Sequence, residues 1–152
     1  MEIGEPEPKL PDEISAFSRW SHLTRRVSRS FAGAVGRVEV GPAVGGEYSE
    51  WRVRFDDPDH EIRLLVGPRR GNGSYPVWRF EQAPAPPANE GTARVDGDEL
   101  IADFAILGVE GRRPVIRERW RLTEDGRLEF SLEGGTEGRK LKRVGGFTAT
   151  RQ

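Results

Sequence analysis

Apolar residues first recur at helical spacing near the N-terminus. They lie three or four positions apart and comprise Leu10, Ile14, Phe17, Trp20, Leu23, Val27 and Phe31. This spacing is close to the 3.6-residue period of an amphipathic helix. Pro11 and Asp12 suit the start of a helix, and Gly33 suits its end. The pattern therefore predicts one helix over about residues 12–31.

After Gly33 the pattern changes to short β-rich runs that alternate in polarity between Gly, Pro, Asn and Asp residues. The predicted strands cover residues 34–40, 47–55, 61–67, 75–82, 92–96, 99–107, 113–123, 127–133, 138–144 and 146–151. So many short strands leave exposed edges unless the sheet closes on itself or is covered. We predict a mainly β fold, an antiparallel up-and-down barrel of about ten strands with one N-terminal helix. The alternative is an α+β fold in which the helix packs on a strongly curved antiparallel sheet.

The charged residues of segment 99–133 predict a register for three strands. Glu124-Asp125-Gly126 suits a three-residue hairpin loop with glycine at the left-handed position. This loop gives an apolar face with the pairs Leu122–Leu128, Trp120–Phe130, Glu118–Leu132, Leu100–Trp120, Ala102–Glu118 and Phe104–Ile116. It gives a charged face with the ladders Glu99–Arg121–Glu129 and Asp103–Arg117–Glu133. A slip of one residue would move every side chain to the other face.

One carboxylate falls on the apolar face. The register places Glu118 between Ala102 and Leu132, two residues from Trp120. A buried carboxylate without a partner is costly, so Glu118 needs a counter-ion or water. Arg151 on the last strand is the predicted counter-ion, and the small Ala102 leaves room for a cavity. The alternatives are a carboxylate at a solvent-filled barrel mouth or an internal salt bridge without a ligand role.

Large aromatic side chains share this predicted inner face. The candidate ligand-binding residues are Trp51, Trp78, Ala102, Phe104, Glu118, Trp120, Phe130 and Arg151. Small-molecule sites are usually apolar walls with a few placed polar groups. The sequence therefore favours binding of a small hydrophobic molecule, with or without an acidic group, in an aromatic-lined barrel cavity. The alternative is simple core packing, which is the normal role of aromatic stripes at strand spacing.

Composition narrows the function classes. The 152 residues suit a single domain, in which residues 1–10 form a flexible tail and residues 11–152 the barrel. Twenty-four Lys and Arg against 25 Asp and Glu lack the basic excess of a nucleic-acid binder. With no Cys and two His, disulfides, thiolate catalysis and Cys-containing zinc sites are excluded. There is no signal peptide pattern and no apolar stretch of membrane-spanning length, so we expect a cytoplasmic protein that contacts no membrane.

The order of elements, the segment 117–132 and a closing strand that ends in Arg151 resemble the calycin superfamily, in particular bacterial lipocalin-like and fatty-acid-binding-protein-like barrels. The resemblance implies a hydrophobic or haem-like ligand inside the barrel and a last-strand arginine, here Arg151, that takes a ligand carboxylate. The Gly-x-Trp of the lipocalin first strand and the helix-turn-helix cap of the fatty-acid binders are missing. No histidine is placed as a haem ligand, and we predict no cofactor and no metal.

Two other function classes stay open. Glu118 could act as the general base of a small isomerase, cyclase or hydrolase, although no second titratable group is tied to it by spacing, and we assign no catalytic residue. An interaction module would instead use an exposed strand edge or the arginine-rich outer face. The segment 56–60, Asp-Asp-Pro-Asp-His, could bind a cation but is more typical of a proline turn. As a binder the protein is expected to be a monomer or a homodimer.

Overall fold

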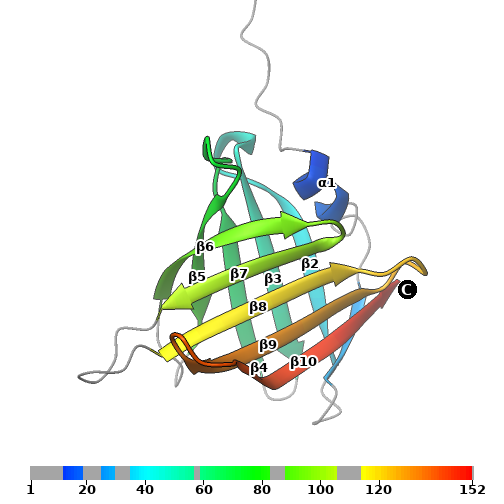
Figure 1. Cartoon of the computed structure of the whole chain (residues 1–152). Coiled ribbons are helices and arrows are strands. Elements are labelled where there is room, and N and C mark those ends of the chain that lie inside the picture. Colours follow the sequence, from blue (N-terminus) through cyan, green and yellow to red (C-terminus); the bar gives the residue numbers. More distant parts are fainter. Residues whose placement is uncertain are drawn as a thin grey trace, which may run out of the picture.

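The strands form one closed antiparallel barrel (Figure 1). The computed structural model describes residues 12–18, 25–29, 35–56, 59–82, 88–105 and 114–151. Around the barrel the strand order is β1-β10-β9-β8-β7-β6-β5-β4-β3-β2, so that consecutive strands from β2 to β10 are neighbours. This confirms the predicted mainly β fold with one N-terminal helix, and the sheet is not the open curved sheet of the alternative. The predicted tail, residues 1–10, lies outside the described residues.

The elements follow one another in a simple meander. The helix is α1 (Asp12–Ser18), and a 3-10 turn, η1 (Val44–Gly46), lies between β2 and β3. The strands are β1 (Arg25–Arg29), β2 (Val35–Ala43), β3 (Tyr48–Asp56), β4 (Asp59–Val66), β5 (Tyr75–Glu81), β6 (Ala88–Asp96), β7 (Glu99–Ala105), β8 (Pro114–Leu122), β9 (Leu128–Thr136) and β10 (Lys142–Arg151). Within the described residues no helix is long and apolar enough to cross a membrane.

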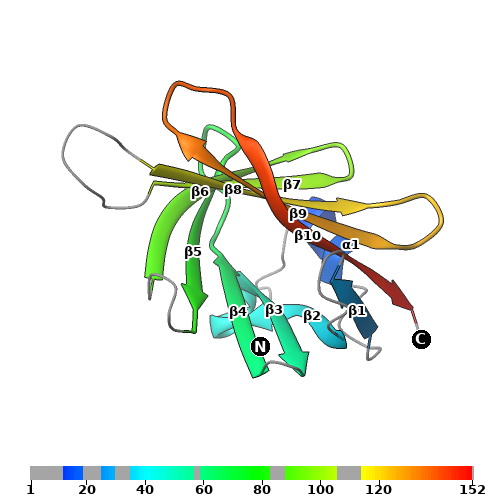
Figure 2. The ribbon, with the colours of Figure 1, turned by 90° about the horizontal axis from the view of Figure 1, so that it is seen from below.

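The N-terminal helix is shorter than its apolar spacing predicts. It ends at Ser18, and residues 25–29 form the strand β1, so the predicted helix over 12–31 is wrong in its second half. The strand β1 pairs with β10 over its whole length and with β2 through Val27–Gly36 and Ser28–Val35 (Figure 2). It thereby covers two sheet edges whose backbone groups would otherwise stay unpaired. This tertiary pairing outweighs the weak local preference for helix.

The last two predicted strands are joined in one strand, β10, which begins later than predicted. Residues 138–141 lie in the turn between β9 and β10, so the predicted strand over 138–144 is wrong in that part. From Lys142 the strand continues through the glycines that separate the two predicted strands, with a bulge between Arg143 and Gly145. Gly146 then lies so close to β9 that a Cβ atom there would be 2.5 Å from the Phe130 carbonyl oxygen. The count of ten strands is reached because β1 is gained where one C-terminal strand is lost.

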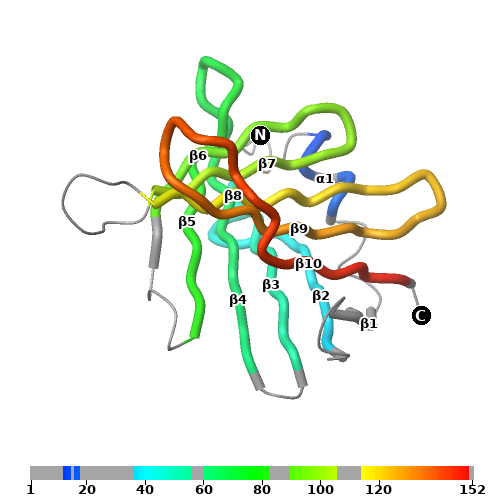
Figure 3. Tube along the Cα trace, turned by 60° about the horizontal axis from the view of Figure 1, so that its bottom comes forward, coloured from blue at the N-terminus to red at the C-terminus, as the bar shows by residue number. Residues whose placement is uncertain are grey.

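The register predicted for β7, β8 and β9 is confirmed at every pair. In the β8–β9 hairpin the Thr123 amide donates to the Arg127 carbonyl at 2.9 Å, which closes the three-residue loop (Figure 3). Gly126 has φ +78°, the left-handed conformation that the loop requires. Trp120 lies opposite Phe130, and the pairs further along both hairpins follow in phase.

A cluster of aromatic rings fills one part of the interior. Phe17 of α1 lies 4.7 Å from Trp51 between ring centroids, and Trp51 meets Trp120 edge-on at 5.2 Å. Trp120 continues to Phe130 at 4.7 Å, and Phe130 stacks on Phe147 at 4.7 Å. All five rings are buried. Such pairs contribute about 0.5–1.5 kcal/mol each beyond area burial, so the cluster both fills the barrel and holds α1 against it.

A hydrogen bond provides the second attachment of the helix. The Tyr75 hydroxyl, at the first residue of β5, donates to the Glu13 carboxylate. Burial raises the pKa of the Tyr75 phenol above its ordinary value, and the bond to Glu13 and the charge of that carboxylate raise it further. The folded protein therefore keeps this proton at pH values where the unfolded chain loses it.

Tyr75→Phe tests this linkage. In the unfolded chain the Tyr75 phenol titrates near pH 10. The contribution of the buried, protonated phenol to the free energy of unfolding is therefore fully present below about pH 10 and decreases as the pH rises further. The advantage of wild type over Tyr75→Phe in free energy of unfolding should shrink by about 1.4 kcal/mol per pH unit above pH 10. Urea denaturation between pH 9 and pH 11 measures it, and a constant difference would contradict the assignment.

Gly91 tests the close approach of β6 and β7. A Cβ atom there would meet the Asp103 carbonyl oxygen and lie 2.7 Å from the Cδ1 atom of Phe104. Overpacking of this kind costs about 1–3 kcal/mol, so Gly91→Ala should lower the free energy of unfolding by that amount. Gly71→Ala is the matched control, because a Cβ atom at Gly71 meets nothing within 4 Å. Equal midpoints in urea for the two variants would show that the strands move apart easily.

Candidate functional site

The carboxylate of Glu118 is fully enclosed, and it has partners. Its side chain projects inward from β8 and is 0% exposed. Arg79 donates from Nε to Oε1 at 2.6 Å, and Trp120 donates from Nε1 to Oε2 at 3.1 Å. The predicted need for a counter-ion is therefore met by Arg79. The contribution predicted for Arg151 stays a prediction. The side chain of Arg151, at the end of β10, lies outside the described part of the chain.

Arg79 reaches this position because β5 faces the opposite way from the prediction. Tyr75, Val77 and Arg79 are buried, while Trp78 between them is only half-buried and Phe80 is 44% exposed. The prediction that Trp78 lines the interior is therefore wrong. The bulky rings of Trp78 and Phe80 favour an inner position in the sequence. The alternation that begins with Tyr75 and Val77 is the one that faces inward, and it places Arg79 inside the barrel.

The Arg79–Glu118 bond joins β5 to β8 across two intervening strands. The inner-face residues next to Glu118 on these strands are small, because Ala102 of β7 pairs with Glu118 and Ala93 of β6 pairs with Ala102. Large side chains at these positions would occupy the path between guanidinium and carboxylate. The room that Ala102 was predicted to leave is thus crossed by the Arg79–Glu118 pair.

The Arg79 guanidinium also binds a second carboxylate, which lies towards one end of the barrel. Arg79 donates from Nη2 and Nη1 to the Glu81 carboxylate at 3.1 and 3.4 Å. His60 Nε2 lies 3.4 Å from Glu81 Oε1. The side chains of Glu81 and His60 are 15% and 20% exposed, so solvent reaches this end. We call His60, Glu81, Arg79, Glu118 and Trp120 the polar chain.

The polar chain begins far from the helix. Glu81 and Tyr75 are the two ends of β5, and α1 is attached at Tyr75. In Figure 1, α1 lies at the upper end of the barrel and the β3–β4 hairpin at the lower end. That hairpin pairs Asp56 with Asp59, which confirms the turn predicted there and places His60 beside the barrel end. Residues 57–58 lie outside the described ranges.

Burial and charge act in opposite directions on Arg79. Burial alone would lower the pKa of this guanidinium, but the negative charges and hydrogen bonds of Glu118 and Glu81 outweigh it, and the pKa is raised. Arg79 is therefore a permanent cation inside the barrel. Removing a pair of ions from water costs several kcal/mol per ion, which the attraction between them offsets only with good geometry. A core selected for stability alone has no need of such a pair.

The aromatic candidates other than Trp78 lie where the sequence predicts. Trp51, Phe104, Trp120 and Phe130 are all buried and face inward, as does Ala102. They are brought together with Glu118 on one continuous inner surface. Their role in binding a ligand stays a prediction.

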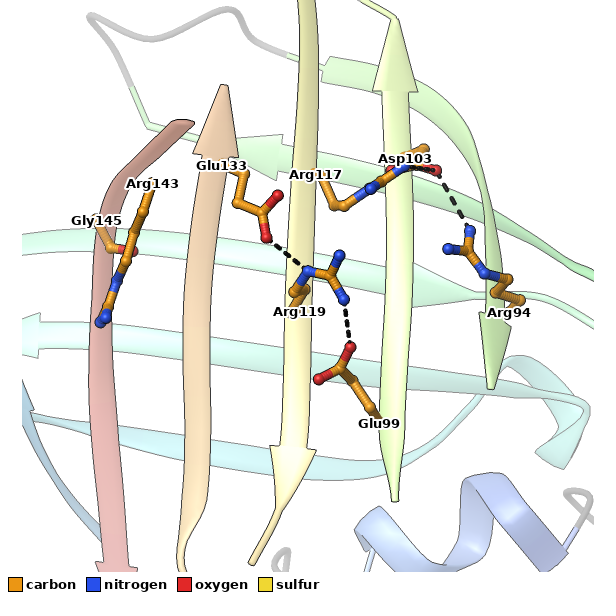
Figure 4. Close-up of polar contacts among 8 residues, drawn as sticks. All are labelled: Arg94, Glu99, Asp103, Arg117, Arg119, Glu133, Arg143 and Gly145. Carbon is orange, nitrogen blue, oxygen red and sulfur yellow. Dashed lines mark hydrogen bonds and ion pairs between the residues drawn. The ribbon is translucent and has the colours of Figure 1, made fainter. Parts of the chain in front are cut away.

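Two ion pairs predicted for the outer surface are confirmed. Arg117 binds Asp103 through Nε at 2.6 Å (Figure 4), and Arg121 binds Glu129 at 2.8 Å. Both pairs are partly exposed, so each contributes about 0.2–1 kcal/mol at most. They fix strand pairing more than they stabilise the fold.

The remaining links of the predicted ladder run diagonally. Arg119 binds Glu99 and Glu133, each at 2.6 Å, so these carboxylates are not held by Arg121 and Arg117 as predicted (Figure 4). An arginine side chain is long enough to reach the residue two positions away on a neighbouring strand. The backbone register is correct, but it does not decide between direct and diagonal partners.

A depression on the outer surface reaches the polar chain at Glu81. Its apolar walls include Leu65 and the exposed Phe80. Its charged lining includes Glu61 and Arg63, which bind each other at 3.0 Å. Glu81 is the one residue of the polar chain among those that line this depression.

Comparison with known proteins identifies no relative. No protein-family model matches the chain, and no curated protein sequence matches it. Membership of the calycin superfamily therefore stays an expectation based on the segment 117–132 and the barrel topology.

Arg79→Met tests the buried pair. The variant leaves Glu118 enclosed without a counter-ion, so it should lower the free energy of unfolding by about 3–5 kcal/mol. The double variant Arg79→Met with Glu118→Leu removes both charges and should recover most of that loss. Arg121→Met, which breaks an exposed pair, should cost less than about 1 kcal/mol. Urea denaturation measures all three, and a small effect of Arg79→Met would show that Glu118 is hydrated.

Proposed function

We propose that the barrel binds a small, largely apolar molecule in its interior. The observation that carries the proposal is the Arg79–Glu118 pair, which is 2% and 0% exposed and yet is connected to the barrel end through Glu81 and His60. Buried ions of this kind cost stability and are often kept for recognition. Such an arrangement of a few polar groups among aromatic walls suits a ligand site.

The proposed ligand would lie beside Glu118, beyond the aromatic cluster. Ile116 and Leu132 point inward next to Glu118 and remain partly exposed, whereas Trp120 on the other side is buried. A barrel of eight strands is just filled by its side chains, so a closed barrel of ten strands encloses more width. The ligand would enter at the barrel end beside Glu81 and His60, which are partly exposed there, and its far end would lie against Trp120.

Binding is favoured over catalysis by the state of Glu118. A general base needs a free lone pair within reach of the substrate proton and a matched acid or orienting group. Glu118 is held instead by a guanidinium at 2.6 Å and an indole N–H at 3.1 Å. We therefore propose no reaction, and a cytoplasmic location stays a prediction.

Titration with N-phenyl-1-naphthylamine, a neutral fluorescent hydrophobe, tests the proposal. We expect saturable binding that changes tryptophan emission, because Trp120 borders the site and donates to Glu118. Trp120→Phe should remove most of this response and weaken binding several-fold. Native mass spectrometry of the purified protein should in parallel detect a retained small molecule.

Two outer-surface variants are the matched controls. Trp78→Phe removes a tryptophan from the outer face and should leave the response intact. Phe80→Ser changes the outer depression and should leave affinity unchanged within about twofold. Absence of saturable binding overturns the proposed function. Binding that survives Trp120→Phe but is lost in Phe80→Ser would place the ligand outside the barrel.

A further inference from the structure

We infer that the ligand carries an amine head group that pairs with Glu118 and Glu81, and that the site discriminates against carboxylates. This inference rests on the proposed function and specifies its ligand. It is opposite to the acidic ligand that the calycin resemblance implies. The argument depends on the balance of charges along the polar chain.

Within the polar chain, whose side chains are all described, one cation faces two anions. The Arg79 guanidinium is shared between Glu118 at 2.6 Å and Glu81 at 3.1 Å. His60 on β4 adds a positive charge only when it is protonated, and its Nε2 atom is 3.4 Å from Glu81. With His60 neutral, the polar chain has an excess of one negative charge. A ligand carboxylate would add a third anion, whereas an ammonium group would balance the site.

Hydrogen-bonding capacity favours the same head group. An ionised carboxylate offers about four lone-pair positions. From the described side chains Glu118 accepts one hydrogen bond at each oxygen, from Arg79 and from Trp120. Each oxygen can therefore accept one more, and a buried acceptor gains most when that bond comes from a charged donor. An ammonium group has three N–H donors and no acceptor, which fits these positions.

The route to the site has the matching chemistry. Glu81 lines the outer depression and also binds Arg79, so it is reached both from solvent and from the interior. Its side chain is 15% exposed, and Ile116 and Leu132 on the inner face are partly exposed as well. An amphipathic amine that enters at this end of the barrel would meet the Glu81 carboxylate before it reaches Glu118.

Three ligands that share one eight-carbon chain isolate the head group. Octylamine, 1-octanol and octanoate are titrated into the full chain at pH 8 by isothermal titration calorimetry. Octylamine is protonated there, as an alkylammonium titrates near the value for lysine. Octylamine should bind at least about tenfold more tightly than octanoate, with octanol between them, because placing like charges together is costly.

Glu81→Gln tests the charge balance directly. The variant leaves one guanidinium with one carboxylate, so the ratio of octylamine to octanoate affinity should fall at least about threefold. Glu133→Gln is the matched control, since Glu133 is also partly exposed and bound to an arginine, but on the outer surface (Figure 4). It changes the net charge equally and should leave the ratio unchanged.

The outcomes separate the two claims. If octanoate binds as tightly as octylamine, or if Glu81→Gln and Glu133→Gln change the ratio equally, the amine inference is wrong and the proposed binding function stands. If none of the three ligands binds and N-phenyl-1-naphthylamine does not bind either, the proposed function itself is wrong. If the naphthylamine binds and the three ligands do not, the head group adds no affinity and the amine inference is wrong.

Discussion

The strand register across the β8–β9 hairpin is the constraint on which the rest of the barrel depends. Side chains alternate between the two faces of a strand, so the hairpin loop at Gly126 decides at once that Trp120 and Glu118 face inward. The outer ion pairs oppose a slip, because a shift of one residue would bury arginines and expose aromatic rings. The contributions of β8 and β9 to the aromatic cluster and to the polar chain, Trp120, Phe130 and Glu118, therefore depend on one loop geometry.

The same chemical pair has different effects on the two faces. Arg117–Asp103 and Arg79–Glu118 both have N–O distances of 2.6 Å, but the first is partly exposed and the second is enclosed. Water screens the outer pair and supplies other partners when it breaks, so its net contribution is small. No such replacement exists inside, so loss of either partner leaves an uncompensated ion. The inner pair consequently fixes how β5 sits relative to β8.

Much of the fold could be predicted from sequence because local signals agreed with the final pairing. The alternation in β8 and β9 and the glycine of their loop point to one register, and both hairpins adopt it. The strand β1 could not be predicted from local sequence. Among the described strands, its five residues form backbone hydrogen bonds only with β2 and β10, and β10 is distant in sequence. Helical spacing of Val27 with earlier apolar residues was a local signal that this long-range pairing overrode.

Only one partner of the buried ion pair could be predicted from the sequence. Glu118 was recognisable because it interrupts an apolar face whose register was known. Its partner Arg79 was not, because the rings of Trp78 and Phe80 outweighed the shorter Tyr75–Val77 phase in assigning faces to β5. A buried charge predicts that a partner exists but not which strand supplies it, since Arg79 of β5 reaches Glu118 of β8 across β6 and β7. The identity of this partner matters for function, because Arg79 also binds Glu81. The resulting excess of negative charge along the polar chain changes the expected ligand from an acid to an amine.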